Sequence, residues 1–370
     1  MSDDDIADLV CLTMVPGVGP LTSRALLERF GDATGVLNAS ITALREIRGV
    51  GPKLADAIAA ARRTNDPARE LELCRRHGVE ALPLGTRGYP RPLAAIPDPP
   101  ALLYRRGTFE PADRLAVALV GSRRCTPYGM RVAEKLAGSL ARAGLTVVSG
   151  LARGIDAAAH RGALKAGGRT IAVLANGLAE VYPPEHVELA KEVAANGALV
   201  AEVHMHQEPL PGLFPQRNRI ISGLCLGVVV VEAAPKSGSL ATAKHAMEQD
   251  REVFAVPGPV DSLASRGCHA LIRDGARLVE TVEDILEELA PKIKGARPTE
   301  GVAEVDRREA LMKLSDQERT VLGTLDDTPR TVDELIGRSG LASSQVMATL
   351  SILQMRKLAR REPGNMFTRC

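Results

Sequence analysis

The chain has 370 residues, of which 45% are hydrophobic and 25% are charged, so two or three domains with packed cores are expected. The formal net charge of +2 excludes a polyanion-binding surface spread over the whole chain, so any nucleic-acid surface must be local. Six scattered cysteines without a C-x-x-C pair argue against a zinc site or a disulfide framework. An acidic start without a signal-peptide core, and the lack of any apolar run of about 20 residues, predict a cytoplasmic protein without a membrane span.

A near-repeat occupies residues 9–62. The strings PGVGP (16–20) and RGVGP (48–52) each precede a helix pattern, and both resemble the helix-hairpin-helix signature. In that motif a glycine hairpin and a helix start present backbone amides to a DNA phosphate. A helical hairpin whose glycines only allow close packing is an equally open reading. The repeat therefore predicts a small α-helical (helix-hairpin-helix, SAM-like) domain over residues 1–65, with or without DNA contact.

Residues 66–112 are a proline-rich connecting segment. A short helix is expected at 71–78 and a strand at 79–82. In 89–104 the repeated X-Pro steps favour extended or turn backbone. We expect this stretch to wrap a surface rather than to form part of a core.

The pattern over residues 115–156 is that of a βαβ unit. Two apolar runs, each followed by a small-residue turn, flank an alanine- and leucine-rich helix pattern. Both turns lie at carboxyl ends of strands, where open parallel sheets bind ligands. Gly121 and Gly150 allow backbone amides to approach an anion, and Arg123 adds a planar donor fork suited to phosphate. The unit predicts a phosphate-binding centre.

The alternation of strands and helices continues beyond this unit. Strands are expected at 170–174, 198–203, 227–232 and 252–256, helices at 156–167, 184–196 and 237–250, and a loop entering a helix at 214–224. The strand patterns lack polar alternation, as expected for strands covered on both faces. They predict an α/β domain over 113–290 with a Rossmann-like, doubly wound parallel sheet.

A polar linker is expected at 291–307, followed by a winged-helix domain over 308–370. Three helix patterns, the first opened by a capping box at Ser315 and Glu318, precede a two-stranded wing. Residues 356–370 contain five Lys or Arg against one Glu, so their net charge is 5 − 1 = +4. A DNA-facing wing is one reading. A protein-docking or dimer-orienting domain is the other, because the third helix carries no basic residue before Arg356.

Two further turns follow later strands and add candidates for anion binding, namely Arg217, Asn218 and Arg219, and then Ser237, Gly238 and Ser239. Four small-residue turns at one sheet edge suit a track of consecutive phosphates better than a single mononucleotide. A structural alternative pairs one of the two arginines with a carboxylate such as Glu232.

The histidines give no clear catalytic or metal site. Asp156 is expected to cap a helix and His160 to bond nearby backbone, while His204 and His206 are expected on the surface. The chain lacks a nucleophile elbow, a P-loop lysine and a complete dinucleotide fingerprint. No catalytic residue, metal site or cofactor is predicted.

Several ordered motifs together carry a family resemblance. They are GSR (121–123), SGLARGID (149–156) with His160, the 214–223 segment, VEA (231–233), SGSL (237–240) and VFAVPG (253–258). The chain resembles the DNA-processing protein A family (DprA, also called Smf) over nearly its entire length. The resemblance implies a Rossmann-like core that binds single-stranded DNA, a homodimer, and loading of the RecA recombinase onto incoming strands during natural transformation.

The resemblance also implies which residues contact DNA. Many members of the family carry basic residues where this chain has Pro184 and Pro211, and Arg153 would partly compensate. Tyr182 and Phe214 are candidates for base stacking. The implied DNA- and phosphate-binding set is Gly121, Ser122, Arg123, Gly150, Arg153, Arg217, Asn218, Arg219, Ser237, Gly238 and Ser239.

Three hypotheses follow. The first is a non-enzymatic single-strand binder that loads RecA. The second is a nucleotide-cleaving enzyme on the related phosphoribohydrolase-like fold, whose Pro-Gly-Gly-x-Gly-Thr loop is replaced here by the turn at 237–242. The third is an adaptor that docks proteins through its two small helical domains and has no affinity for nucleic acid.

Overall fold

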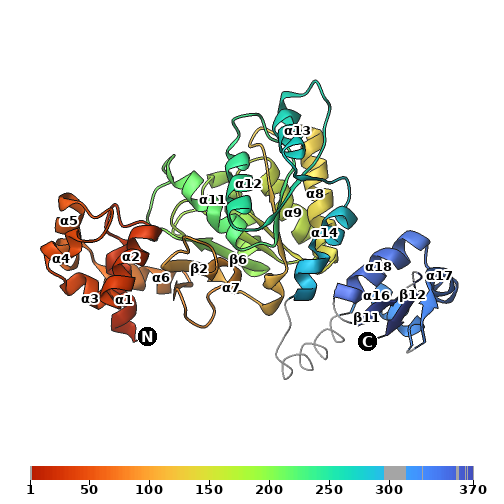
Figure 1. The fold of residues 1–370 in the computed structure, drawn as a ribbon, viewed down its shortest axis with the longest axis horizontal. Helices are drawn as coiled ribbons and strands as arrows, with labels where there is room; N and C mark the ends of the chain where they lie inside the picture. The colour runs from red at the N-terminus through yellow and green to blue at the C-terminus, as the bar shows by residue number, and fades with distance from the viewer. Residues whose placement is uncertain are drawn as a thin grey trace. The chain divides into compact units, whose positions relative to one another are not determined.

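The computed structural model describes residues 2–295, 314–326, 328–355, 358–362, 364 and 366–369. The chain forms two compact units, Met1–Val282 and Glu283–Cys370 (Figure 1). Within the described residues, no helix combines the length and the apolar character needed to cross a membrane.

The near-repeat forms two similar turns in the amino-terminal helical region. Gly17 and Gly49 have φ angles of 94° and 90°, a conformation that favours glycine. Gly19 and Gly51 are the N-caps of helices that begin with proline. The predicted helical domain is confirmed, and its helices are α1 (Asp3–Thr13), α2 (Pro20–Phe30), α3 (Ala33–Asn38), α4 (Ile41–Arg45) and α5 (Pro52–Thr64).

The proline-rich connecting segment forms part of the core, so the expectation that it wraps a surface is wrong. Tyr89, Leu93 and Ile96 are buried, and the Tyr89 hydroxyl donates to the Pro100 carbonyl at 2.8 Å. The X-Pro steps constrain the backbone, but its apolar side chains still pack against the sheet. The elements of this segment are α6 (Pro67–Arg76), β1 (Val79–Pro83), α7 (Arg91–Ala94) and β2 (Leu102–Gly107).

The central sheet has nine strands in the order β1-β2-β6-β5-β4-β3-β7-β8-β9 (Figure 1). From β6 to β9 all neighbours are parallel, whereas β1 and β2 form an antiparallel edge. The strand order reverses between β3 and β7, as in a doubly wound sheet. The predicted Rossmann-like sheet is therefore confirmed, with strands β3 (Ala116–Val120), β4 (Thr146–Ser149), β5 (Thr170–Val173), β6 (Gly197–Ala201), β7 (Gly227–Val230), β8 (Glu252–Ala255) and β9 (Arg277–Leu278).

Both faces of the sheet are covered. Ile171 and Val173 belong to an apolar core that also contains Ile220, whereas Ala172 belongs to a second core that extends to Leu9 in the first helix. The amino-terminal helices therefore pack on the same apolar core as one face of the sheet. The helices of the α/β region are α8 (Pro127–Arg142), α9 (Ile155–Lys165), α10 (Val187–Ala195), α11 (Leu213–Gly223), α12 (Gly238–Glu248) and α13 (Arg266–Arg273).

Several boundaries differ from the sequence-based expectation by a few residues, and two of these differences have a clear structural setting. The segment from Phe214 is helical from its start, because Pro215 lies in the first turn, where its missing amide hydrogen costs nothing. Residues 291–295 of the expected linker belong to α14 (Val282–Gly295), which contains Pro291. The rest of that linker lies outside the described residues.

The second unit contains the predicted winged helix. Ser315 and Glu318 form the expected capping box, and Leu335, Leu350 and Phe367 are buried in its core. The wing strands pair with a short third strand, in the order β10-β12-β11. Its elements are α16 (Asp316–Thr324), β10 (Arg330–Thr331), α17 (Val332–Ser339), α18 (Ser343–Met355), β11 (Ala359–Glu362) and β12 (Met366–Arg369).

Candidate phosphate-binding site

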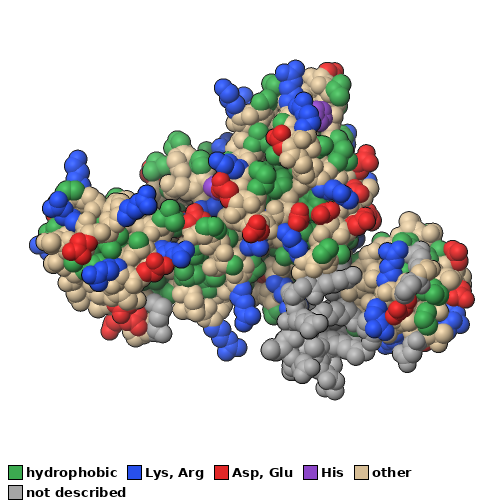
Figure 2. All heavy atoms as spheres, in the orientation of Figure 1, with side chains coloured by type: hydrophobic (Ala, Val, Ile, Leu, Met, Phe, Trp, Pro, Cys, Tyr) green, Lys and Arg blue, Asp and Glu red, His purple; other side chains and the backbone are tan. Residues whose placement is uncertain are grey.

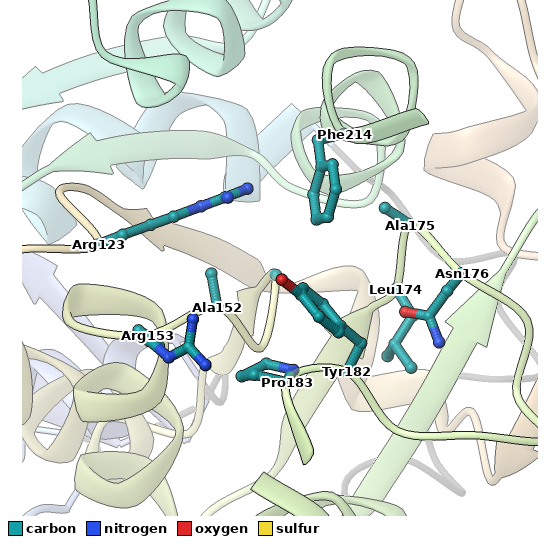
Figure 3. A pocket seen from close by; sticks show the side chains of 10 residues that line it. Arg123, Ala152, Arg153, Leu174, Ala175, Asn176, Tyr182, Pro183 and Phe214 are labelled. Carbon is teal, nitrogen blue, oxygen red and sulfur yellow. The ribbon is translucent and has the colours of Figure 1, made fainter. Parts of the chain in front are cut away.

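A small pocket of about 20 Å³ lies beyond the carboxyl ends of β4 and β5 (Figure 3). Its volume suits one or two water-sized groups rather than a nucleobase. The loops after β3, β4 and β5 and the start of α11 supply its lining. The lining residues are Arg123, Gly150, Ala152, Arg153, Leu174, Ala175, Asn176, Tyr182, Pro183 and Phe214.

Arg123 is one of two exposed cations of this pocket, the other being Arg153. Its guanidinium carbon lies 4.6 Å from the centre of the Phe214 ring, toward which the side chain extends in Figure 3. The Tyr182 and Phe214 rings are 6.2 Å apart at an interplanar angle of 60°. Among the described residues, Arg123 forms no ion pair with a carboxylate. The ring therefore supports the cation from one side and leaves its donors available to an anion.

The loop after β4 is already occupied by a carboxylate of the protein. The Gly150 and Ala152 amides donate to the Asp156 carboxylate at 3.1 and 3.3 Å. A Cβ atom at Gly150 would lie 2.6 Å from the Arg217 guanidinium nitrogens, so this glycine provides space for the arginine. These amides bind a carboxylate of their own loop. The sequence-based expectation that they would face an external anion is therefore wrong for this loop.

Arg217 is buried beneath the pocket instead of lining it. Its guanidinium donates to the carbonyls of Gly150, at 2.8 Å, and Val173. Burial lowers the pKa of Arg217 to about 10, an effect that the Asp156 charge opposes. Burial likewise raises the pKa of Asp156, and Arg217 opposes that rise. The two opposite charges favour each other electrostatically, while the hydrogen bonds of Arg217 to the two carbonyls connect α11 to β5 and to the loop after β4.

Arg219 is also buried, on another side of α11. It forms a bidentate pair with Glu202 and donates to the Asp98 carbonyl. The structural alternative, a carboxylate pair for one of the two arginines, therefore holds for Arg219 with Glu202 as its partner, whereas Arg217 donates to backbone carbonyls. Glu232 instead accepts from the Thr126 amide at 2.8 Å and the Thr126 hydroxyl at 2.6 Å.

The remaining candidates lie beside the pocket. Half-buried Asn218 donates to the Gly238 carbonyl at 3.2 Å, which ties the starts of α11 and α12. Ser237 caps α12, its hydroxyl lies 2.8 Å from that of Ser239, and Gly238 between them is exposed. Ser122 accepts from the Arg124 amide at 3.1 Å.

Of the predicted phosphate-binding set, the pocket brings together Arg123, Gly150 and Arg153, and the two base-stacking candidates Tyr182 and Phe214 also line it. At Gly121 a Cβ atom would lie 2.6 Å from Ile155 Cγ1, which makes this glycine a packing requirement. The sequence reasoning missed Asn176, whose amide donates to the Glu180 carbonyl at 2.7 Å. The sequence contained a signal for this residue, because a polar side chain shortly after the carboxyl end of a parallel strand lies where such sheets bind ligands.

His160 and His186 are buried, whereas His206 is exposed, as expected, and His204 is half-buried. His160 is buried, and its Nδ1 donates to the Thr170 hydroxyl at 2.7 Å rather than to backbone as expected, because that hydroxyl donates to the Val147 carbonyl. Asp156 accepts amides of the preceding loop, whereas Gly154 is the N-cap of α9. Within the described residues, no three metal-binding side chains cluster.

We expect the buried His160 to make the protein less stable in acid. Burial lowers the pKa of His160 from 6.5 to about 3, so only the unfolded chain takes up its proton between these values. Its contribution is complete above pH 6.5 and falls by about 1.4 kcal/mol per pH unit below it. Denaturant titrations at pH 7 and pH 5 should show a larger loss for the wild type than for His160→Gln, in which the other titrating groups are retained. Equal losses would contradict the expectation.

The comparisons with known proteins cover all three regions. Family models match residues 11–64 (SAM-like helix-hairpin-helix tandem), 81–290 (DNA recombination-mediator protein A) and 305–365 (DprA winged helix domain). The protein Smf of Synechocystis sp. is 33% identical over 397 residues, which cover 100% of both chains.

Solved structures of two DNA processing proteins A are also similar to this chain. The X-ray structure of DNA processing protein A from Streptococcus pneumoniae has 34% identity and a TM-score of 0.66, covering 76% of this chain and 95% of its own. The DNA processing protein A from Helicobacter pylori, a structure that addresses its single-stranded DNA binding mode, has 30% identity and a TM-score of 0.52. That match covers 58% of this chain and 96% of the other.

Proposed function

The chain belongs to the DNA-processing protein A family, and on this premise we propose that it is a non-enzymatic protein that binds single-stranded DNA. The observation that carries the proposal is Arg123, an exposed cation stacked on Phe214 at the carboxyl edge of the sheet. Phosphate contacts would dominate the affinity, so binding should depend weakly on base sequence and strongly on salt.

The proposed binding surface is smaller than the sequence suggested. Arg123, Arg153 and the exposed turn at Gly238 are its accessible members, while Arg217 and Arg219 support it from below. On the face drawn in Figure 2, positive and negative side chains are interspersed. A local surface of this kind fits a chain whose net charge is only +2.

Phe214 provides a test that is independent of charge. Phe214→Leu removes a ring that can stack on a base and that supports the Arg123 guanidinium. We expect affinity for oligo-dT to fall roughly 5-fold, with an unchanged salt dependence because no charge is lost. A fluorescence-anisotropy titration checks this. A changed salt dependence would show that the substitution alters the number of phosphate contacts, which would contradict an effect through stacking alone.

The proposed role of the bound strand is RecA loading, which the family resemblance supports. The assay is RecA filament formation on single strands coated with single-strand binding protein, with and without this chain. Faster filament formation is expected. No acceleration by a protein that binds the same strand would separate this role from strand binding itself.

A second copy of the chain is the other proposed partner. The family resemblance supports a homodimer, and so does an open apolar groove of about 770 Å³ that includes Leu240, Val260 and Leu278. Val260 is 87% exposed, an unusual environment for a large aliphatic side chain. Light scattering should give twice the 39.3 kDa mass of one chain, and a single-chain mass would contradict the homodimer.

A further inference from the structure

The pocket arginines differ in how their charge is compensated. Arg217 is buried below the pocket, where the nearby Asp156 charge favours its protonated form, and Arg123 has no carboxylate partner among the described residues. Arg153, which lines the pocket, forms an ion pair with Glu185 through its Nε. The pair is exposed to solvent, with side-chain exposures of 56% and 46%.

The fold holds Glu185 in this position. It lies in the short 3-10 helix Pro184–His186, directly after the pocket residues Tyr182 and Pro183. The buried His186 ring contacts the Leu151 carbonyl at 2.9 Å, which ties this helix to the loop that carries Arg153. The ion pair therefore connects two segments whose backbones are already held together.

Each partner of this ion pair shifts the pKa of the other. A hydrogen bond from Arg153 lowers the pKa of Glu185, and the Glu185 carboxylate raises the pKa of Arg153. A phosphate that binds Arg153 either shares the guanidinium with this carboxylate or displaces it, and in both cases it approaches a negative charge at the rim of the pocket. Both effects oppose the binding of a polyanion.

We infer that Glu185 is an affinity-limiting residue, which competes with DNA phosphate for Arg153 and keeps single-strand binding weaker than the pocket would otherwise allow. This inference rests on the proposed single-strand binding. It assigns to Glu185 an effect opposite to that of every basic residue of the site: its removal strengthens binding.

The test is the affinity of full-length Glu185→Gln for oligo-dT by fluorescence anisotropy over a salt series. We expect binding roughly 2- to 5-fold tighter than wild type at low salt, with the difference shrinking as salt rises. The melting temperature should not change, because an exposed pair contributes little to stability.

Glu188→Gln is the matched control. Glu188 is exposed on α10 and pairs with Lys191 at 2.8 Å, so the substitution changes the net charge equally without releasing a pocket arginine. We expect a smaller gain from it. In the Arg153→Gln background, the gain from Glu185→Gln should vanish, because no guanidinium remains to be released.

The outcomes separate the inference from the proposed function. Equal affinities of Glu185→Gln and Glu188→Gln, or a gain that persists without Arg153, would overturn the role of Glu185 while single-strand binding stands. Binding only after Glu185→Gln would show the competition at its strongest. Failure of both the wild type and Glu185→Gln to bind would overturn the proposed function together with the inference.

Discussion

Replacing Arg217 with Leu is expected to destabilise the folded protein by about 3–5 kcal/mol, in part because it removes the buried cation whose charge favours the ionised Asp156 carboxylate. The substitution also removes the donors that satisfy the Gly150 and Val173 carbonyls. A thermal melt should show a midpoint lower by roughly 10 °C. Arg217 would then be essential for the fold and only indirectly important for binding.

Asp156→Asn in the Arg217→Leu background separates charge from packing. The double variant removes both buried charges, so we expect it to recover part of the lost stability. A single variant that melts within 2 °C of wild type, as a rough limit, would show that Arg217 is dispensable beneath the pocket. Arg217→Leu would then be informative about DNA contact.

Replacing Arg123 with Ala is expected to weaken binding to single-stranded DNA by roughly 10- to 100-fold, which corresponds to the loss of one charge-assisted phosphate contact. Stability should be unaffected, because Arg123 is exposed and its guanidinium contacts the Phe214 ring at the surface. Anisotropy titrations and a thermal melt of the same preparation measure the two quantities.

Arg124→Ala is the control for this experiment. Arg124 is the exposed neighbour of Arg123, it does not line the pocket, and its loss changes the net charge by the same amount. A small effect is expected. If both variants lose affinity equally, the contribution is general electrostatic attraction and the stacked guanidinium of Arg123 has no special role.

The sheet and its turns were predictable because their signals are local. Short uninterrupted apolar runs such as 116–120 and 227–230 are typical of strands covered on both faces, and the small residues after them indicate the edge where ligands bind. The capping box at Ser315 and Glu318 likewise marks a helix start without tertiary information. The helix-hairpin-helix domain, the α/β domain and the winged helix could all be predicted from local patterns of this kind.

The burial of Arg217 and Arg219 was not predictable in the same way. Their partners, the Gly150 carbonyl and Glu202, are distant in sequence. The sequence around a basic residue near a glycine turn is the same whether its guanidinium faces solvent or a buried carbonyl. The core position of Leu93 was missed for a related reason. The X-Pro rule describes backbone conformation and does not indicate what the side chains contact.

The central claim is tested most directly by the anisotropy of labelled oligo-dT with the wild-type protein, against a duplex of equal length, over a salt series. The account predicts preferential binding of the single strand and a steep, linear loss of log affinity with log salt. Equal or stronger binding of the duplex, or no binding of either at low salt, would contradict a single-strand site built on Arg123.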